Sequence, residues 1–508
     1  MPIPADVLAV KRPKNTVVYV YGKDKDKYGV KERIGCKYKN GKSYPVNGKT
    51  VGHIKNGVYV PMEDESEESL QSLFCTESAI KGWANYELCF RLSQDLLEEL
   101  KKLYIDKEAK QILAIAILRV CCPEITDSDL KDAYDESTLS DSLPNLPLSR
   151  NTVCSFQQVL GKGYDRIHAF MKNRAEKVGI DHHLLVDGTL KTDDSRVNTF
   201  SEFSRKARLK GSKDISVLYA FDLEKMEPIC SQCFPGNMLD LTAYDSFVKD
   251  NGIKSGILVG DKGFPAKSIE GVLKENKNLH YFNPLKRSSK IAQDNDMYNY
   301  DGNIDFCYGF LGRAESIQYK KVKLSHTDKW LYSFRDSGRA GKEDDDWLAN
   351  HKGDKYSDEE YRKKRELFGT VVFESDVDLT PADAWKTYSY RWQIELVMRY
   401  YKDSLCFANT RVHNDFSVIG SEFINFLSTV ITFRLLDLFD KKKLLDNMTY
   451  RKVMRILAKG KKVRTEGEWK LDRMNPEHIR ALQTLDLLPK PEQPEKRKVG
   501  RPRKKVSL

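Results

Sequence analysis

Residues 380–402 of this 508-residue chain read TPADAWKTYSYRWQIELVMRYYK, and the chemistry of the whole chain centres on this stretch. Four of its polar side chains follow at offsets of 0, 3, 7 and 14: Tyr388, Arg391, Glu395 and Lys402. At about 100° per residue, these offsets place all four within roughly 60° on one face of an α-helix. Thr380 as the N-cap and Pro381 at the first helical position predict where this helix begins.

A carboxylate between cations on one helix face has two interpretations. Such faces are common as solvated ion-pair ladders, which need no further function. The carboxylate can also be one part of a site whose other parts come from elsewhere in the chain. The positions of other acidic residues decide between the two.

The composition is that of a large intracellular protein. With 40% hydrophobic residues, 508 residues can form several domains or one large domain with insertions. Ten cysteines without a framework of paired spacings indicate a reducing cytosol, so we expect a cytoplasmic protein. We also expect no membrane contact, because the apolar run Ile112 to Val120 is short and contains Arg119, and residues 1–14 lack a signal-peptide core.

The net charge of +11 is concentrated at the two ends of the chain. Residues 1–60 carry 13 Lys and Arg against 4 Asp and Glu, and residues 490–508 carry 8 against 2, which leaves −4 for the 429 residues between them. Basic ends on a slightly acidic body indicate arms that bind a polyanion. The tail at 489–508 is rich in Lys, Arg and Pro, which predicts disorder. Its Arg501 and Arg503 resemble the core of an AT-hook that lies in A·T minor grooves, and a basic tail without sequence preference is the alternative.

Residues 1–62 are predicted to form a small basic β region. Asn-Gly, the strongest short hairpin signal, occurs at 40–41, 47–48 and 56–57 between runs of Val, Tyr and Lys. This sheet either contacts DNA or serves as a solubilising surface. Helical periodicity predicts helices at 70–178 and again at 441–488. Two short helices at 150–178 are compatible with a helix-turn-helix, although ordinary helical packing is the preferred interpretation.

Residues 182–289 are expected to be mixed α/β, with strands first and then an alternation of strands and helices. Two of the predicted strands are apolar runs that end in an aspartate, at Asp187 and at Asp261. Strand ends are where α/β folds place reactive groups, although a single aspartate of this kind is more often a turn or a cap. Residues 290–370 are expected to be a mainly β insertion, which separates this core from its continuation at 371–440.

Two strand-end aspartates and a helical glutamate form a donor set for hard cations. Three carboxylates can hold two Mg²⁺ ions, which polarise a phosphodiester and activate water or a 3′-hydroxyl. No neighbouring histidine pair competes for these metals. Cys230 and Cys233 have no partner pair at zinc spacing and are discounted as a zinc site.

These residues resemble the DDE transposases of bacterial insertion sequences. The similar group is defined by Tyr-x2-Arg-x3-Glu-x6-Lys, which the four helix residues quoted above match at all three spacings. Its first aspartate lies in an Asp-Gly-Thr strand end, as in Asp187-Gly188-Thr189, and its second in Gly260-Asp261-Lys262-Gly263-Phe264. The gaps between the three carboxylates are 74 and 134 residues, and the longer gap fits a β-rich insertion before the glutamate. The resemblance covers about residues 180–440 and gives no argument for residues 1–70.

The resemblance implies an α/β fold: an RNase H-like catalytic core, a mainly β insertion before the helix of the catalytic glutamate, and helical and small β N-terminal regions. It implies that Asp187, Asp261 and Glu395 are the catalytic and metal-binding triad for two Mg²⁺ ions, for which Mn²⁺ may substitute. Tyr388, Arg391 and Lys402 would contact phosphates at the end of the mobile element. Relatives hold a flipped base with a Trp, for which Trp330 and Trp392 are the candidates.

The implied activity is DNA transposition, in which the protein cuts the ends of its mobile element and joins them to target DNA. The implied partners are double-stranded DNA, as terminal inverted repeats and as target, and a second copy of the chain in a homodimer on paired ends. The implied location is the bacterial cytoplasm, in association with the nucleoid. Two alternatives stay open, namely a domesticated, non-catalytic DNA-binding regulator and an RNase H-like nuclease that does not join strands.

Overall fold

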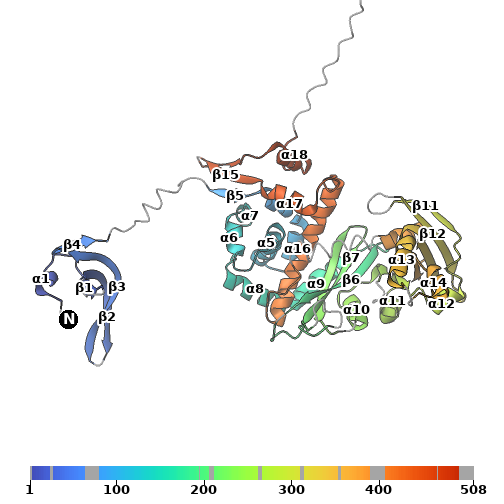
Figure 1. The fold of residues 1–508 in the computed structure, drawn as a ribbon, viewed down its shortest axis with the longest axis horizontal. Helices are drawn as coiled ribbons and strands as arrows, with labels where there is room; N and C mark the ends of the chain where they lie inside the picture. Colours follow the sequence, from blue (N-terminus) through green and yellow to red (C-terminus); the bar gives the residue numbers. More distant parts are fainter. Residues whose placement is uncertain are drawn as a thin grey trace, which may run out of the picture. The chain divides into compact units, whose positions relative to one another are not determined.

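The computed structural model describes residues 3–22, 27–39, 41–62, 79–193, 195–204, 211–238, 240–260, 266–308, 314–352, 356–389, 407–465 and 467–490. The chain divides into two compact units. The first consists of residues 1–79 with 464–469, and the second contains the remaining residues. Each unit is described separately (Figure 1).

The first unit is a small four-stranded antiparallel sheet in the order β1-β2-β3-β4. Its elements are α1 (Ala5–Leu8), β1 (Thr16–Tyr21), β2 (Lys27–Lys39), β3 (Lys42–Lys55) and β4 (Val58–Pro61). Val18, Val30 and Ile54 form its buried core, against which side chains of the N-terminal segment pack. With so few buried residues, this unit has a correspondingly small hydrophobic contribution to its stability.

Two of the three predicted Asn-Gly turns are hairpin turns, and the third prediction is wrong. Asn56 and Gly57 both have positive φ, 48° and 75°, and they join β3 to β4 in the manner of a type I′ turn. The turn at 40–41 joins β2 to β3. Asn47 and Gly48 instead lie inside the 14-residue strand β3, where the register against β2 shifts. The register shift is a β-bulge, because β2 and β3 continue to pair on the far side of Asn47.

The second unit begins with a helical region, as the periodicity predicts. Its helices are α3 (Ala84–Arg91), α4 (Gln94–Lys101), α5 (Asp106–Cys121), α6 (Leu130–Asp135), α7 (Leu139–Ser142), α8 (Arg150–Lys162) and α9 (Tyr164–Ala175). Helix α8 packs on the long helix α16 (Asp415–Lys441), and α9 packs on strand β8. A Cβ atom at Gly420 would lie 2.0 Å from the carbonyl oxygen of Gln157, so glycine permits the close approach of α8 and α16.

Helix α16 is long and apolar enough to cross a membrane by length and composition alone, a run that the sequence prediction overlooked. In the fold, 89% of its most apolar window is buried inside the protein. It packs against α5, α8 and β8. Its apolar composition therefore follows from its place in the core, where a helix is hydrophobic all round.

A nine-stranded mixed sheet forms the other part of the second unit, in the order β11-β12-β13-β14-β10-β9-β6-β7-β8. Its strands are β6 (His183–Thr192), β7 (Asp214–Asp222), β8 (Glu227–Pro235), β9 (Ser255–Val259), β10 (Asn278–Leu285), β11 (Gly302–Tyr308), β12 (Ala314–Lys323), β13 (Trp330–Asp336) and β14 (Thr370–Ser375). Strands β6, β7 and β8 are an antiparallel meander. Strand β9 then pairs parallel to β6, and β10 pairs parallel to β9.

Helices fill the connections between the parallel strands. They are α10 (Asp240–Asp250) between β8 and β9, and the 3-10 helix η1 (Ala266–Ile269) with α11 (Glu270–Glu275) between β9 and β10. Parallel neighbours need such crossovers, because a tight turn can join only antiparallel strands. The α/β character expected of residues 182–289 is therefore present in this part of the sheet.

The strands at 290–370 extend the same sheet. Strand β14 pairs antiparallel with β10 on one side and with β13 on the other, and β12 and β11 follow outward. The polar stretch at 338–364, for which no helix was predicted, contains α13 (Ser337–Asn350) and α14 (Asp358–Arg365), and α12 (Lys290–Asp294) precedes β11. The division of the chain into core and insertion stays a prediction.

The C-terminal part of the second unit contains α17 (Tyr450–Ala458) and α18 (Pro476–Thr484), both in the region predicted to be helical. The side chains of Thr449 and Asn475 cap these helices by accepting from the backbone N–H groups of Lys452 and His478. Strands β15 (Lys461–Thr465) and β16 (Glu468–Leu471) lie between them and were not predicted. Strand β15 pairs with β5 (Ile80–Gly82). The predicted disorder of 491–508, including Arg501 and Arg503, lies outside the described residues.

Candidate catalytic site

Asp187 lies in the middle of β6, between β7 and β9. It follows the buried residues Leu184, Leu185 and Val186, and is itself half-buried. Its Oδ1 accepts a hydrogen bond from the backbone N–H of Gly188 at 2.8 Å. The next residue, Gly188, is exposed and has no side chain. The strand is therefore accessible beside this carboxylate.

Strand β9 runs parallel to β6, and the register pairs Leu185 with Val259. Asp187 therefore lies two residues beyond the last paired position on β6. On β9, the described chain continues one residue further to the buried Gly260, whose N–H donates to Oδ1 of Asn283 on β10 at 3.1 Å. Asp261 is the next residue and lies outside the described residues.

The helix that the signature stretch predicts begins where expected. Residues 381–389 are helical, and Thr380 and Asp383 hydrogen-bond to each other as a cap. The backbone N–H of Asp383 donates to Oγ1 of Thr380 at 3.1 Å, and this hydroxyl donates to Oδ2 of Asp383 at 2.6 Å. The further predicted site residues Arg391, Trp392, Glu395 and Lys402 lie outside the described residues. Asp187 is therefore the one carboxylate of the predicted triad within the described residues.

Tyr388 is the one signature side chain within the described part of this helix, and it is 8% exposed. Its ring packs against Phe373 of β14 and Trp385 of its own helix, with centroid distances of 5.0 and 5.4 Å. Its hydroxyl accepts a hydrogen bond from Nη1 of Arg339 on α13 at 3.0 Å. Sequence reasoning missed Arg339, because nothing in its local pattern links it to a residue 49 positions away.

Arg339 belongs to a charged network centred on Glu343. Glu343 accepts from both terminal nitrogens of Arg287 at 2.7 Å, from Nε of Arg339 at 2.9 Å, and from the backbone N–H of Gly369 at 2.9 Å. Burial alone would raise the pKa of Glu343, but these donors outweigh it and lower the pKa to about 2. The pKa of Arg339 is raised, since Tyr388 and Glu343 offset its burial. The carboxylate and the guanidinium therefore remain charged throughout the physiological range.

Trp330, a candidate base-stacking residue, begins β13 and is half-buried. The ammonium groups of Lys321 and Lys323 on β12 lie 4.5 and 5.6 Å from its ring centroid. These are cation–π distances, so one side of the ring is held by lysines. Its base-stacking role stays a prediction.

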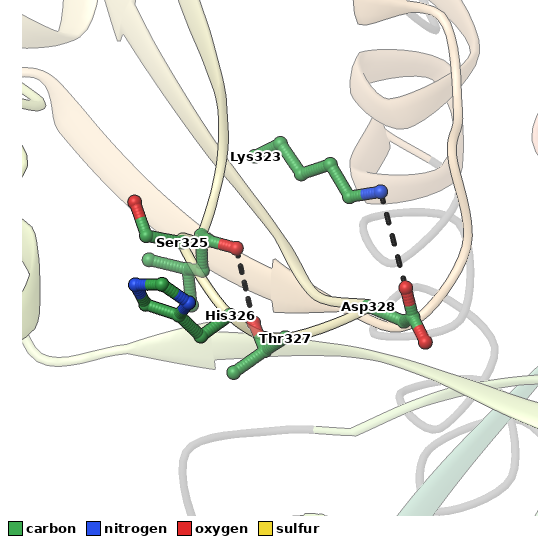
Figure 2. A pocket seen from close by; sticks show the side chains of 6 residues that line it. Lys323, Ser325, His326, Thr327 and Asp328 are labelled. Carbon is green, nitrogen blue, oxygen red and sulfur yellow. Dashed lines mark hydrogen bonds and ion pairs between the residues drawn. The ribbon is translucent and has the colours of Figure 1, made fainter.

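The turn that connects β12 and β13 lines an open pocket of about 410 Å³ (Figure 2). Lys323 pairs with Asp328 across this turn at 3.9 Å, and the Thr327 hydroxyl donates to the Leu324 carbonyl at 3.3 Å. All lining residues belong to this one turn, residues 323–328. A pocket made by a single turn offers no convergent groups for catalysis.

A buried ion pair lies on the same strand as Asp187. Lys191, 1% exposed, pairs with Glu422 of α16, which is 5% exposed. Glu422 also accepts from Nδ2 of Asn425 at 2.9 Å, and Asn425 in turn accepts from Nη1 of Arg119 on α5 at 2.8 Å. This network joins the strand of the candidate catalytic aspartate to the two central helices.

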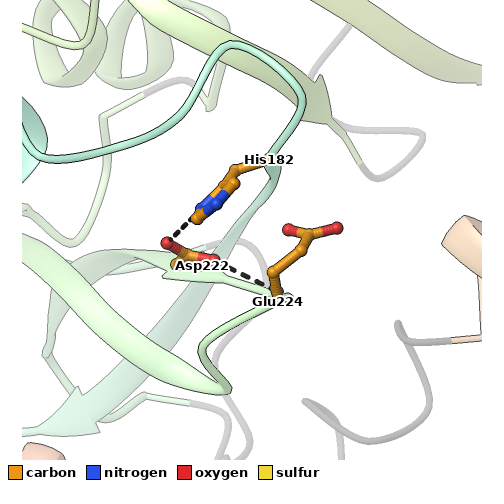
Figure 3. Close-up of side chains that lie close together, drawn as sticks. All are labelled: His182, Asp222 and Glu224. Carbon is orange, nitrogen blue, oxygen red and sulfur yellow. Dashed lines mark hydrogen bonds and ion pairs between the residues drawn. The ribbon is translucent and has the colours of Figure 1, made fainter.

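A second cluster of metal-ligand type lies at the start of β6. Ligand atoms of His182, Asp222 and Glu224 lie within 4.8 Å of one another (Figure 3). Asp222 accepts from Nδ1 of His182 at 2.8 Å and from the backbone N–H groups of Glu224 and Lys225 at 3.1 and 3.0 Å. These hydrogen bonds connect the entry to β6 with the turn after β7, which gives His182 and Asp222 a structural role.

This cluster is a poor match for the metals expected at the candidate catalytic site. His182 precedes Asp187 by five positions along the chain, which corresponds to roughly 16 Å between the two residues in an extended strand. Glu224 is already held by the N–H and the ring of His183, both at 2.7 Å. Burial would raise the pKa of Glu224, but the hydrogen bonds from His183 lower it overall. An imidazole in the donor set also suits zinc better than Mg²⁺.

The comparisons with known proteins point to one family. Residues 179–419, a little under half of the chain, match the family model "Transposase DDE domain". This range spans Asp187, Asp261 and Glu395, and it supports a DDE transposase and thus, in general, a nuclease with strand-transfer activity that uses divalent metals. No curated protein matches the chain.

Two solved structures of transposase–DNA complexes are similar to parts of the chain. One is a piggyBac transposase synaptic complex with hairpin DNA, at 12% identity and a TM-score of 0.37, covering 74% of this chain and 80% of that one. The other is a Mos1 transposase paired-end complex with the left transposon end, at 13% identity and a TM-score of 0.15, covering 31% and 58%. These scores are too low to support an argument, so the function rests on the family match and on the site itself.

Proposed function

We propose that the chain is a DNA transposase of the bacterial insertion-sequence kind, which cuts the ends of its own mobile element and joins them to target DNA. The observation that carries this proposal is the match of residues 179–419 to the transposase DDE domain, because that range contains all three carboxylates chosen from the sequence. The parallel pairing of β6 and β9 supports it further. Asp187 lies within β6 and not at its end, where the sequence predicts it, but it is two residues past Leu185, which pairs with Val259 at the end of β9. The parallel register therefore places Asp187 near the end of the strand that precedes Asp261.

The proposed core is RNase H-like. Its support is the arrangement of β6 to β10, in which a three-stranded meander is followed by two parallel strands added beside the first. Helices α10 and α11 lie in the two crossovers. Strands β11 to β13 would be the insertion that precedes the glutamate helix, although they continue the sheet of the core.

We propose Asp187, Asp261 and Glu395 as the catalytic and metal-binding residues. Carboxylate oxygens are the ligands that Mg²⁺ prefers, and the half-buried carboxylate of Asp187 beside an exposed glycine fits such a site. Two Mg²⁺ ions, or Mn²⁺ in their place, supply Lewis-acid polarisation of the scissile phosphodiester when bound. The three side chains would hold these ions beside the reacting phosphate, and no residue of this set has to donate or accept a proton.

Arg391 and Lys402 are proposed to contact phosphates of the element end, Arg391 through paired hydrogen bonds and Lys402 as a point charge. Tyr388 is the third residue proposed for this contact, although its ring is buried and its hydroxyl accepts a hydrogen bond from Arg339 in the structure. Trp330 and Trp392 remain the candidates for holding a flipped base, and Arg501 and Arg503 for contacts to the minor groove. We propose a homodimer on paired ends, in the bacterial cytoplasm at the nucleoid.

The test is product analysis with the full chain, Mg²⁺, and a duplex that bears the inverted repeats flanking its gene, together with a supercoiled target. The proposal expects nicks at the repeat ends and covalent joining of those ends to the target. Cleavage without joined product would favour the nuclease alternative. Binding without any cleavage would favour the regulator. Asp187→Asn should abolish both products, whereas the control Glu270→Gln, an exposed carboxylate on α11, should retain them.

A further inference from the structure

The hairpin formed by β2 and β3 extends beyond the sheet to which it belongs. Strand β1 pairs with β2 only from Lys27 to Glu32, and β4 pairs with β3 only from Gly52 to Lys55. Among the described residues, the part of the hairpin at 33–49 is therefore a two-stranded ribbon that pairs with no further strand, and we name it the β-arm (Figure 1). With about 3.3 Å per residue, its β2 strand from residue 33 to 39 is roughly 20 Å long.

The β-arm is basic and carries exposed aromatic and apolar side chains. Residues 33–49 contain five Lys and Arg and no Asp or Glu. Tyr38 is 81% exposed, Ile34 69% and Tyr44 51%, and none of them belongs to the small core of the unit. If the ribbon only stabilised the sheet, its apolar side chains would be buried. If it only made the surface soluble, it would not expose three large apolar or aromatic side chains.

The register divides the side chains of the β-arm between its two faces. Lys37 pairs with Tyr44, so their side chains lie on one face, and Lys42 lies on the same face two residues before Tyr44. Tyr38 pairs with Ser43 on the opposite face. We name the face with Lys37, Lys42 and Tyr44 the basic face. The register also places Lys39, the partner of Lys42, on this face, so the face combines lysines with one ring at the end of the ribbon.

We propose that the β-arm is a DNA-binding ribbon whose basic face enters the major groove of duplex DNA. The major groove of B-DNA admits a two-stranded β-ribbon, and lysines on such a ribbon can contact the phosphates or the base edges. The complementary charge of the arm, without any acidic residue, identifies a polyanion as its partner. The inference rests on the proposed function only in that duplex DNA is taken as this polyanion.

The proposal is tested by equilibrium binding of the full-length chain to a duplex that carries the inverted repeats, over a range of salt concentrations. The slope of log K against log salt is negative, and each lost phosphate contact reduces its magnitude by about 0.9. The variant Lys37→Gln/Lys42→Gln should therefore reduce the magnitude of the slope by up to about 1.8. The control Lys14→Gln/Lys55→Gln removes the same charge from exposed positions outside the arm and should leave the slope unchanged. Equal effects of both variants would overturn the proposal.

The two tyrosines provide a second matched pair, independent of net charge. Tyr44→Ser on the basic face should weaken binding several-fold, whereas Tyr38→Ser on the opposite face should not, although Tyr38 is the more exposed. Circular dichroism and thermal unfolding of each variant show whether the fold is retained. Weakening by Tyr38→Ser alone would overturn the choice of face.

Groove occupancy is tested by chemical footprinting of the same complexes. The wild-type chain should protect guanine N7, which lies in the major groove, and the Lys37→Gln/Lys42→Gln variant should lose part of that protection. Protection of adenine N3 in the minor groove instead would overturn the groove assignment. The groove assignment would also be overturned if the Lys37→Gln/Lys42→Gln variant lost as much affinity for duplex RNA as for duplex DNA, because the major groove of RNA is too narrow for side chains.

These outcomes are separable from a failure of the proposed function. If Asp187→Asn cleaved normally, the triad would be wrong while the arm could still bind DNA. If the wild-type chain cleaved and joined DNA but the arm variants bound like wild type, the arm inference alone would fail.

Discussion

Nη1 of Arg339 donates a hydrogen bond to the hydroxyl oxygen of Tyr388 at 3.0 Å. Arg339 lies on α13, and Tyr388 lies in the helical segment at 381–389. Glu343 accepts hydrogen bonds from both Arg339 and Arg287, so a chain of charged hydrogen bonds connects this segment to α13 and to the residues that follow β10. Helix α13 therefore helps to position the described start of the signature helix.

We predict that Arg339→Met and Tyr388→Phe destabilise the protein non-additively. Tyr388→Phe removes this hydrogen bond and should cost about 1 kcal/mol, whereas Arg339→Met also removes the hydrogen bond from Nε to Glu343 and should cost more. Because the bond between Arg339 and Tyr388 is lost in either variant, the double variant should cost less than the sum. Urea unfolding of the four proteins measures the coupling. The matched control is Arg362→Met on α14, whose side chain is 77% exposed and pairs only at i,i+4 with Asp358. Strict additivity would contradict the coupling.

The pH dependence of stability should reveal Glu343. Its pKa in the folded protein, about 2, is below the ordinary value of 4.5, so its stabilising contribution is complete above pH 4.5 and is lost as the pH falls toward 2. Glu343→Gln should therefore lower the thermal midpoint most at neutral pH, and the difference from wild type should shrink between pH 4.5 and 2. A difference that grew on acidification would contradict the assigned direction of the shift.

Lys191→Met should be among the most destabilising single changes on β6. It leaves the carboxylate of Glu422 buried and without its ammonium partner, which costs about 3–5 kcal/mol. The double variant Lys191→Met/Glu422→Gln removes the buried charge and should recover part of this loss. Chemical denaturation of both variants gives the comparison. If the double variant were no more stable than Lys191→Met, the unpaired charge of Glu422 would not account for the loss of stability.

Gly420→Ala tests the close packing of α8 on α16. The new methyl group would lie 2.0 Å from the Gln157 carbonyl oxygen, so the helices must move apart, at a cost of about 1–3 kcal/mol. Gly271→Ala on α11 is the control, because a Cβ atom there meets nothing within 4 Å and alanine favours a helix. The measurement is the midpoint of unfolding of Gly420→Ala and of Gly271→Ala. Equal stability of these two variants would contradict the close contact of Gly420 with Gln157.

The local features of the fold could be predicted from the sequence. Thr380 with Pro381 marks the start of its helix because capping is a property of a few adjacent residues. The apolar runs before Asp187 and Asp261 are strands because they are buried on both faces of a sheet covered by helices. The Asn56-Gly57 hairpin follows from the positive φ angles that these two residues tolerate.

Other features depend on signals that apolar periodicity does not contain. Helix α14 has no buried residue, and only its Ser357 cap, acidic first turn and basic last turn indicate it. Asn47-Gly48 is a turn signal that the long pairing of β2 with β3 overrides. Arg339 joins the candidate site through a contact 49 residues away, and such contacts exist only after the sheet has formed. The roles of Asp261, Arg391, Glu395 and Lys402 stay predictions.

The most direct test of the central claim is Mg²⁺-dependent cleavage of a duplex that bears the element's inverted repeats. The assay compares the wild-type chain, Asp261→Asn, Glu395→Gln and the control Glu270→Gln, with DNA-end binding measured in parallel. The account predicts nicks at the repeat ends with wild type and control, none with the two triad variants, and end binding by all four. Normal cleavage by Asp261→Asn or Glu395→Gln would contradict the triad.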